Sequence, residues 1–508
     1  MRRLALLLLL VGATGCHGCA QPRPTPDTVT GLALSGDPDD LTPQQRKARG
    51  LRDLRHPLAR FYGRLAELDG GSKTAHASVL HFGDSHSASD TYTGPLRDAL
   101  VGRFGDGGRG FILPGIPWKG YAQRCVDFGM KGDWVRARAA QAEAQPPFGM
   151  GAVRLESATK GDSISRGPSR RCSYGTRVDR VTFHALSMPG GGSVDLFRGE
   201  ELVGTRSTAA DSLSLLPLTV EAPGTGEARL VVRGDGPVAL LGSVGEREAA
   251  GIRYSVAAFN GAQASQFLRG NPGLISAEVK AVAPDLLIYA FGTNEAWGVA
   301  GQTDGASAER RAAVAERGVK AATDGLKRWL ELTRGAARNA DCLVVLPPDA
   351  TRNPQAVRGC LEAAETPEAV EACSVSEPMV AEVAASFRSL AEDEGCAVWD
   401  MAAAMGGTGS MWAWMGAVPA RGQADGVHLT GTGYTLVGER LAADLLENFE
   451  LWKRNESFAL PTGAIAPAAQ SVRDCAPAMR LRLEAADNGD LAPAAEAAAR
   501  LCLARSRN

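Results

Sequence analysis

Five short apolar runs alternate with helical patterns along the chain, and this alternation restricts the fold more than any other feature. The runs span residues 79–82, 254–259, 285–291, 342–346 and 396–399. Apolar residues recur with a period of three to four at residues 96–104, 308–333, 380–392 and 433–449. Strands that alternate with helices pair in parallel. We therefore expect an α/β fold with a doubly wound, mostly parallel sheet.

The hydrophobic pattern of the sequence changes between the first and second apolar runs. Short alternating segments occupy residues 178–183, 193–197 and 228–233, and Gly and Pro separate them without an intervening amphipathic helix. Such spacing is typical of an antiparallel β-sandwich. We expect this sandwich, residues 150–249, to be inserted into an α/β domain formed by residues 41–149 and 250–455.

The amino terminus resembles an export signal. Two arginines precede an apolar run at residues 4–11, which is too short to span a membrane, and Ala13-Thr-Gly-Cys16 is similar to a bacterial lipobox. We expect residues 1–15 to be a lipoprotein signal peptide, with a lipid on Cys16 as the sole membrane attachment. Residues 16–40 are Pro-rich, and we expect them to form a tether. Cleavage after Ala20, giving a soluble secreted protein, is the alternative. On either interpretation we expect export, to the periplasm of the bacterial cell envelope.

The cysteines agree with export. Beyond Cys16 and Cys19 the chain has eight: Cys125, Cys172, Cys342, Cys360, Cys373, Cys396, Cys475 and Cys502. An even number outside the cytoplasm favours disulfides, but eight cysteines allow 105 connectivities. Cys342 and Cys396 each open a predicted strand and are candidates for neighbours. Residues 456–508 are predicted to form a tail with a helical hairpin, one cysteine in each helix.

Composition excludes several kinds of partner. A net charge of −2 argues against nucleic-acid binding. No two of the seven histidines have metal-ligand spacing on a helix, so we expect neither a metal nor another cofactor. Residues 105–110 match Gly-x-Gly-x-x-Gly, but they follow a helix rather than a strand. A tight active-site loop is therefore predicted there instead of a dinucleotide site.

The candidate chemistry starts at Ser85. Gly83-Asp84-Ser85 ends the first predicted strand abruptly, which places the serine at the carboxyl end of a central strand, where open α/β sheets bind ligands. A serine needs a base and an orienting group. His428, with Asp425 three residues before it, lies on the loop after the last strand. That spacing allows one loop to present an imidazole and the carboxylate that sets its tautomer.

These motifs resemble the SGNH (GDSL-type) hydrolases. Gly83-Asp84-Ser85, the turn at Gly261, Gly292-Thr-Asn294-Glu and Asp425-Gly-Val-His428 follow the order of that superfamily. The resemblance implies a three-layer, flavodoxin-like fold, a Ser85 nucleophile, a His428 base and an Asp425 orienter. It also implies an oxyanion hole made by the backbone N–H groups of Ser85 and Gly261 and by the Asn294 amide.

A narrower likeness points to a substrate. Leu80-His-Phe-Gly-Asp-Ser-His86, Gly108-Arg-Gly-Phe111 and Phe291-Gly-Thr-Asn-Glu-Ala296, with the inserted sandwich, resemble the peptidoglycan O-acetylesterases of Gram-negative bacteria. In those enzymes the insert resembles a carbohydrate-binding module. We therefore expect an esterase that removes O-acetyl groups from a glycan, with O-acetylated peptidoglycan first. The alternatives are an O-acetyltransferase with the same triad and a catalytically inactive glycan-binding envelope protein.

Overall fold

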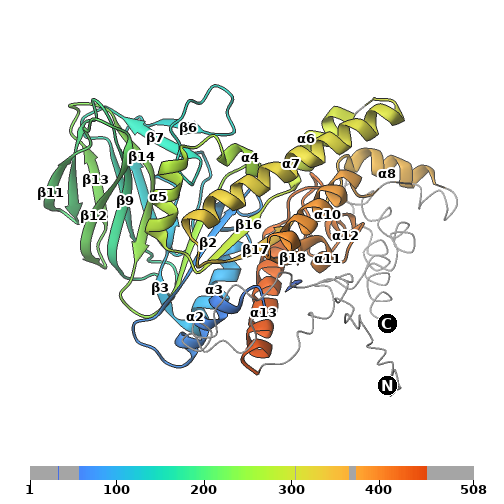
Figure 1. The fold of residues 1–508 in the computed structure, drawn as a ribbon, viewed down its shortest axis with the longest axis horizontal. Coiled ribbons are helices and arrows are strands. Elements are labelled where there is room, and N and C mark those ends of the chain that lie inside the picture. The colour runs from blue at the N-terminus through green and yellow to red at the C-terminus, as the bar shows by residue number, and fades with distance from the viewer. Residues whose placement is uncertain (1–31, 34–55, 304, 365–372, 374, 455–508) are drawn as a thin grey trace, which may run out of the picture.

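The computed structural model describes residues 32–33, 56–303, 305–364, 373 and 375–454 (Figure 1). Several sequence predictions lie outside these residues: the signal peptide, the lipid on Cys16, the tether apart from residues 32–33, and the tail hairpin with Cys475 and Cys502. They stay predictions.

The central sheet has the strand order β1-β18-β17-β16-β2-β15-β3. Its five long strands correspond to the five apolar runs: β2 (His76–Gly83), β15 (Gly251–Ala258), β16 (Leu286–Ala290), β17 (Asp341–Leu346) and β18 (Ala397–Asp400). These five pair in parallel. Counted along the chain their order is 2-1-3-4-5, the flavodoxin-like arrangement. The predicted fold class is confirmed.

Two short edge strands complete this sheet. β3 (Asp106–Gly108) pairs in parallel with β15, and β1 (Leu32–Ala33) is the antiparallel partner of β18. The sequence prediction missed both, because strands of two and three residues are too short to show a period.

Both faces of the central sheet are buried, as parallel strands require. Successive side chains of a strand point to opposite faces, and in β2 this divides Val79 from Leu80. Val79 belongs to the apolar cluster formed with α2, α3 and α13, whereas Leu80 belongs to the cluster formed with α5, α7 and α10. The helices of the first group are α2 (Ala59–Asp69), α3 (Thr93–Phe104), α11 (Met401–Met405), α12 (Ser410–Met415) and α13 (Gly431–Arg454). Those of the second are α4 (Ala264–Phe267), α5 (Pro272–Val282), α6 (Thr293–Thr303), α7 (Ala308–Ala336) and α10 (Pro378–Asp393).

The insert consists of two antiparallel sheets, which lie to one side of the α/β unit in Figure 1. One has the order β12-β9-β14-β7-β6, with β4 also paired to β14, and the other the order β11-β10-β13-β8-β5. Their strands are β4 (Gly110–Ile112), β5 (Val126–Lys131), β6 (Val135–Arg138), β7 (Val153–Ser157), β8 (Ser163–Pro168), β9 (Val178–Ser187), β10 (Ser193–Arg198), β11 (Glu201–Ser207), β12 (Ser214–Gly224), β13 (Ala228–Val232) and β14 (Val238–Glu246). A separate apolar cluster fills the space between the sheets, so the predicted β-rich insert is present.

The edges of the insert differ from the sequence expectation in two ways. Strands β5 and β6 belong to the antiparallel sheets although they precede residue 150. The segment at residues 105–110 contributes β3 and β4 rather than a loop, because its glycines let its backbone approach neighbouring chain closely. A Cβ at Gly107 would lie 2.8 Å from the Gly251 carbonyl oxygen, and one at Gly110 would lie 2.4 Å from Ser255 Oγ. The division into domains stays a prediction.

Three disulfides lie in the described part of the chain: Cys125–Cys172, Cys342–Cys396 and Cys360–Cys373. The second links two neighbouring strands near their starts, as the positions of its cysteines suggested. No helix among the described residues combines the length and the apolar character needed to cross a membrane.

Candidate active site

The turn after β2 holds Ser85 at the carboxyl end of the sheet. Gly83 is required there, because a Cβ at this position would lie 2.3 Å from Ser87 Oγ. The Asp84 carbonyl accepts hydrogen bonds from the N–H groups of Ser87 (3.1 Å) and Ala88 (2.9 Å), which closes the turn. Ser85 is half-buried within it. The strand therefore ends in a tight turn that presents one hydroxyl group.

His428 and Asp425, on a loop near the carboxyl end of the described chain, lie next to Ser85. His428 Nε2 lies 3.0 Å from Ser85 Oγ, and His428 Nδ1 lies 2.7 Å from Asp425 Oδ2. A nucleophile, a base and an orienting carboxylate need this chain of contacts. The three residues predicted as a triad are thus within hydrogen-bonding distance, although Ser85 and His428 are 343 positions apart.

The loop that carries Asp425 and His428 is anchored through its backbone. Gln423 N–H donates to the His428 carbonyl (2.7 Å), and the Gln423 side-chain amide donates to the Leu429 carbonyl (2.8 Å). Gly426 has a φ of 72° and accepts a hydrogen bond from Thr351 N–H at 2.7 Å. This short hairpin-like loop is therefore tied to the segment that follows β17.

The Asp425 carboxylate is held in its charged form. Partial burial acts to raise its pKa, but hydrogen bonds from Val427 N–H, the His428 ring and His428 N–H outweigh burial, and the pKa lies below its usual value. A charged acceptor on Nδ1 favours the tautomer in which Nε2 is free to accept the proton of a serine hydroxyl.

The two other predicted oxyanion residues lie on the neighbouring strands. Gly261 follows β15 at a φ of 80°, and Asn294 follows β16 at the start of α6. Asn294 Nδ2 donates to the Ala262 carbonyl at 2.9 Å, which brings the two loops into contact. Strands β2, β15 and β16 are adjacent, so Ser85, Gly261 and Asn294 follow the carboxyl ends of neighbouring strands at the topological switch point.

Sequence reasoning missed two buried carboxyl groups beside these residues. Asp84 Oδ1 accepts a hydrogen bond from His86 N–H at 2.9 Å, and Asp84 Oδ2 lies 3.5 Å from Asn294 Nδ2. Burial raises the pKa of Asp84 to about 8; the nearby Glu295 carboxyl adds to this, and the hydrogen bond from His86 N–H opposes it. Burial likewise raises the pKa of Glu295 to about 7, against hydrogen bonds from the N–H groups of Ala264 and Gly292. The sequence could have indicated both carboxyl groups, because Asp84 directly precedes Ser85 and Glu295 directly follows Asn294.

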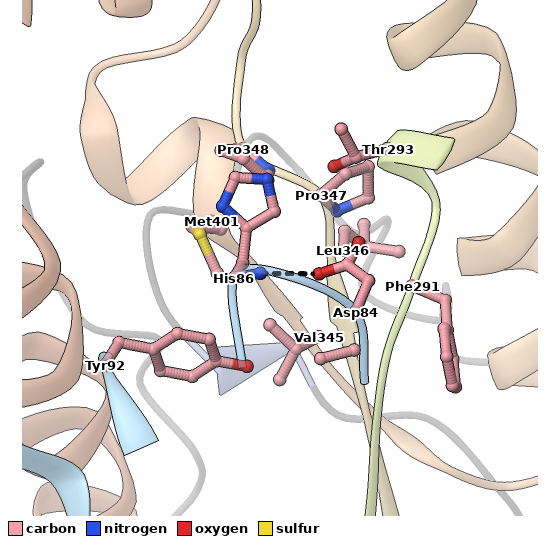
Figure 2. Close-up of a pocket in the computed structure, with 11 residues that line it drawn as sticks. Asp84, His86, Tyr92, Phe291, Thr293, Val345, Leu346, Pro347, Pro348 and Met401 are labelled. Carbon is pink, nitrogen blue, oxygen red and sulfur yellow. Dashed lines mark hydrogen bonds between the residues drawn. The ribbon is translucent and has the colours of Figure 1, made fainter. Parts of the chain in front are cut away.

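His86 packs against the ring of His428. Its ring is buried, lies 5.4 Å from the His428 ring between centroids, and is 3.0 Å from Tyr434 Oη through Nδ1. Burial, with the neighbouring His428, lowers the pKa of His86 to about 3, so its ring is neutral at ordinary pH. Together with Asp84, Thr293 and Pro347, this ring lines a cavity of ≈ 10 Å³ (Figure 2). A cavity of that size has room for about one water molecule.

No group of three or more His, Cys, Asp and Glu side chains in the described ranges is arranged to hold a metal ion. The triad and the predicted oxyanion donors are side chains and backbone groups of the chain itself.

Comparison with known proteins assigns the domain. Residues 224–436 match the GDSL-like Lipase/Acylhydrolase family. The chain carries a GDSL-like lipase/acylhydrolase domain. The match includes the loops of Gly261, Asn294 and His428, whereas Ser85 lies before it. The predicted membership of the SGNH superfamily is confirmed, and so is the prediction that the protein is an ester hydrolase.

A solved structure titled "Peptidoglycan O-acetylesterase in action, 5 min" shares the fold of this acylhydrolase. The TM-score is 0.61 at 22% sequence identity, over 77% of this chain and 96% of the other. An acetyl xylan esterase (16% identity, 38% and 80% coverage, TM-score 0.25) and a family two carbohydrate esterase from Cellvibrio japonicus (11%, 65% and 99%, 0.24) are also similar. No curated protein sequence matches the chain.

Proposed function

We propose that this acylhydrolase is an exported serine esterase that removes O-acetyl groups from a glycan, with O-acetylated peptidoglycan as its substrate. The observation that carries the proposal is the chain of contacts from Asp425 through His428 to Ser85, at 2.7 and 3.0 Å. The fold shared with a peptidoglycan O-acetylesterase supports the choice of substrate, as do the motifs around Ser85 and Asn294.

In the first step Ser85 Oγ attacks the carbonyl carbon of the acetyl ester. His428 Nε2 takes the hydroxyl proton, while Asp425 stabilises the imidazolium that forms. As the tetrahedral intermediate collapses, the bond between the acetyl carbon and the sugar oxygen breaks. His428 returns the proton to that oxygen, leaving an acetyl group on Ser85.

Three donors stabilise the negative oxygen of the tetrahedral intermediate in this proposal. They are the N–H groups of Ser85 and Gly261 and the side-chain amide of Asn294. Removing one oxyanion donor costs about 10²–10³ in kcat. In the second step His428 deprotonates a water molecule, which attacks the acetyl-enzyme and releases acetate and free Ser85.

The proposed setting of this chemistry is the bacterial cell envelope. The amino-terminal signal motif directs export, and a lipid on Cys16 would hold the enzyme at a membrane while the tether lets it reach the glycan. The disulfides Cys125–Cys172 and Cys342–Cys396 favour an oxidising compartment. The β-rich insert would add contact area for a polymer beside the small serine site.

Acetate release tests the proposal. Purified protein should liberate acetate from O-acetylated peptidoglycan faster than from O-acetylated xylan, with water as the sole acceptor. Ser85→Ala and His428→Ala should each abolish release, and both variants should keep the melting temperature of the parent. Equal release by Ser85→Ala and the parent protein would rule out the serine mechanism.

The alternatives predict different outcomes in the same assay. An O-acetyltransferase would release little acetate until a sugar hydroxyl acceptor is added. A catalytically inactive glycan-binding protein would bind the polymer but release no acetate, and a fluorophosphonate probe would leave Ser85 unlabelled.

A further inference from the structure

The loops of Gly261 and Asn294 are joined by a side chain that takes no part in the proposed reaction. Glu295 is 5% exposed and lies in the first turn of α6. Its Oε1 accepts a hydrogen bond from Ala264 N–H at 2.8 Å, and its Oε2 accepts one from Gly292 N–H at 3.0 Å. One carboxyl group therefore bridges the segment after β15 and the segment after β16.

Two further hydrogen bonds connect the same loops. Asn294 Nδ2 donates to the Ala262 carbonyl at 2.9 Å, and Gln263 Nε2 donates to the Asn294 carbonyl at 3.0 Å. With the bond from Ala264 to Glu295, three contacts cross between the loops. Two of the three involve Asn294 itself. The relative position of Gly261 and Asn294 thus depends on a compact set of polar contacts.

A buried carboxyl group in this place has an energetic cost. Removing a carboxylate from water is unfavourable unless hydrogen bonds or charge compensate it. Here the compensation comes from backbone N–H groups and from the amino-terminal end of a helix, which favours an anion. An apolar residue of similar volume would avoid the cost but could not hold the two loops. The contacts at both oxygens explain why a carboxyl group occupies the position.

We propose that Glu295 is a positioning residue that fixes the Gly261 N–H and the Asn294 amide so that both donors converge on one oxyanion. The inference rests on the proposed function, because it assigns Gly261 and Asn294 to the oxyanion hole. Donors of this kind work only when they are held in place before the charge develops. A displacement of about 1 Å at a reacting centre costs about 10²-fold in rate.

Glu295→Gln tests the role with little change in volume. The amide oxygen can accept one of the two hydrogen bonds, whereas the amide nitrogen would face the other N–H group, either that of Ala264 in the segment after β15 or that of Gly292 before α6, and loosen the set of contacts. With p-nitrophenyl acetate we expect kcat to fall about 10- to 100-fold while KM stays within about threefold. A kcat within twofold of the parent value would overturn the inference.

Glu278→Gln is the matched control. Glu278 is also fully buried, and its Oε2 also accepts a hydrogen bond from a backbone N–H, that of Met150, at 2.6 Å. It lies on α5 and contacts the insert instead of the loops of Gly261 and Asn294, since its Oε1 is 2.9 Å from His184 Nδ1 on β9. We expect Glu278→Gln to lower the melting temperature but to leave kcat within about twofold. An equal loss of kcat in both variants would show a general effect of disturbing a buried carboxyl group and would overturn the inference.

A double-mutant cycle distinguishes positioning from destabilisation. If Glu295 acts through the oxyanion donors, Glu295→Gln should cost much less in an Asn294→Ala background than in the parent protein. Independent losses of kcat that multiply in the double variant would overturn the inference.

Gln263→Ala removes a second contact between the loops, at a half-buried position, and should fold even where Glu295→Gln does not. We expect it to lower kcat about three- to tenfold. An unchanged kcat would count against the inference.

The Ser85→Ala variant distinguishes failure of the proposed function from failure of the Glu295 inference alone. If Ser85→Ala kept full activity, the serine mechanism and this inference would fall together. If Ser85→Ala were inactive while Glu295→Gln and Gln263→Ala kept the parent kcat, only the inference would fall.

Discussion

A single carboxylate decides how the His428 ring is oriented. Asp425 accepts hydrogen bonds from His428 Nδ1 and from the N–H groups of Val427 and His428, so its position and the tautomer of the ring are set together. Substitution at this position should therefore act directly on the base.

Asp425→Asn should be severe. The amide oxygen can keep the backbone N–H groups, but the amide nitrogen then faces Nδ1 and stabilises the tautomer that carries its proton on Nε2. That tautomer cannot accept the Ser85 proton, so kcat should fall about 10³- to 10⁴-fold with little change in melting temperature. Steady-state kinetics on p-nitrophenyl acetate measure the loss, and a decrease below about tenfold would mean that other groups orient the ring.

Asp84 should make stability depend on pH. Burial raises its pKa from an ordinary value of 3.8 to about 8. Between these values the folded protein retains a proton that the unfolded chain has released. The contribution of Asp84 to the free energy of unfolding is therefore largest at low pH and decreases as pH rises toward 8.

Asp84→Asn should remove this contribution to the pH dependence of the free energy of unfolding. The difference in free energy of unfolding, variant minus parent, should increase from about pH 5 to about pH 8. Over this range the parent loses stability, because Asp84 ionises more readily in the unfolded chain than in the folded protein, whereas asparagine does not ionise. The asparagine oxygen can still accept the hydrogen bond from His86 N–H. Urea unfolding at several pH values provides the measurement, and parallel curves for the two proteins would contradict the assignment.

At the scale of elements, the loop between α12 and α13 depends on one glycine. Gly426 has a φ of 72°, and a Cβ there would lie 2.2 Å from the Thr351 carbonyl oxygen. The close approach places Asp425 and His428 against the segment after β17. A side chain at this position would move the loop as a unit, away from Ser85.

Gly426→Ala should impair catalysis more than stability. We expect at least about a tenfold loss of kcat, because the His428 ring would be displaced from Ser85. Gly407→Ala is the control, since Gly407 has a φ of 84° but a Cβ added there would meet no atom within 4 Å. It should cost roughly 1–2 kcal/mol through backbone strain alone, with kcat unchanged. Similar kcat values for the two variants would show that the contact with Thr351 does not position the loop.

At the scale of the whole molecule, the β-rich insert and the α/β unit share buried contacts. His184 on β9 is paired with Glu278 on α5 at 2.9 Å, and both side chains are at most 1% exposed. Phe111 packs in the same apolar cluster as the central sheet. These contacts lead us to expect that the two parts unfold together.

His184→Ala tests this coupling. Removing the ring leaves one oxygen of the buried Glu278 carboxyl group without that hydrogen-bond partner, which should lower the free energy of unfolding by about 1–3 kcal/mol. Hydrogen exchange of the variant should show β13 in the insert and β17 in the central sheet opening with the same free energy. Earlier opening of β13 alone would mean that the insert unfolds independently.

Local patterns in the sequence were sufficient to predict the five long strands, four of the helices and the positions of the candidate site residues relative to those strands. Period-two and period-3.6 patterns depend on neighbouring residues, so the five long strands and the helices α3, α7, α10 and α13 could be predicted before any tertiary contact was known. Turn chemistry at Gly83 and the spacing of Asp425 and His428 are local in the same sense. Together with the resemblance to a known superfamily, they were enough to name the candidate residues: Ser85, Gly261, Asn294, Asp425 and His428.

Tertiary structure decided what depends on contacts across the chain. The pairing of β2 between β15 and β16, the burial of Asp84, and the bridge from Glu295 to Ala264 each join segments that no local period relates. Short strands such as β5 and β6 take their conformation from partners in a sheet rather than from their own sequence. The distance of 3.0 Å between Ser85 and His428 belongs to this class, because packing of the whole α/β unit brings two residues 343 positions apart to one edge of the sheet.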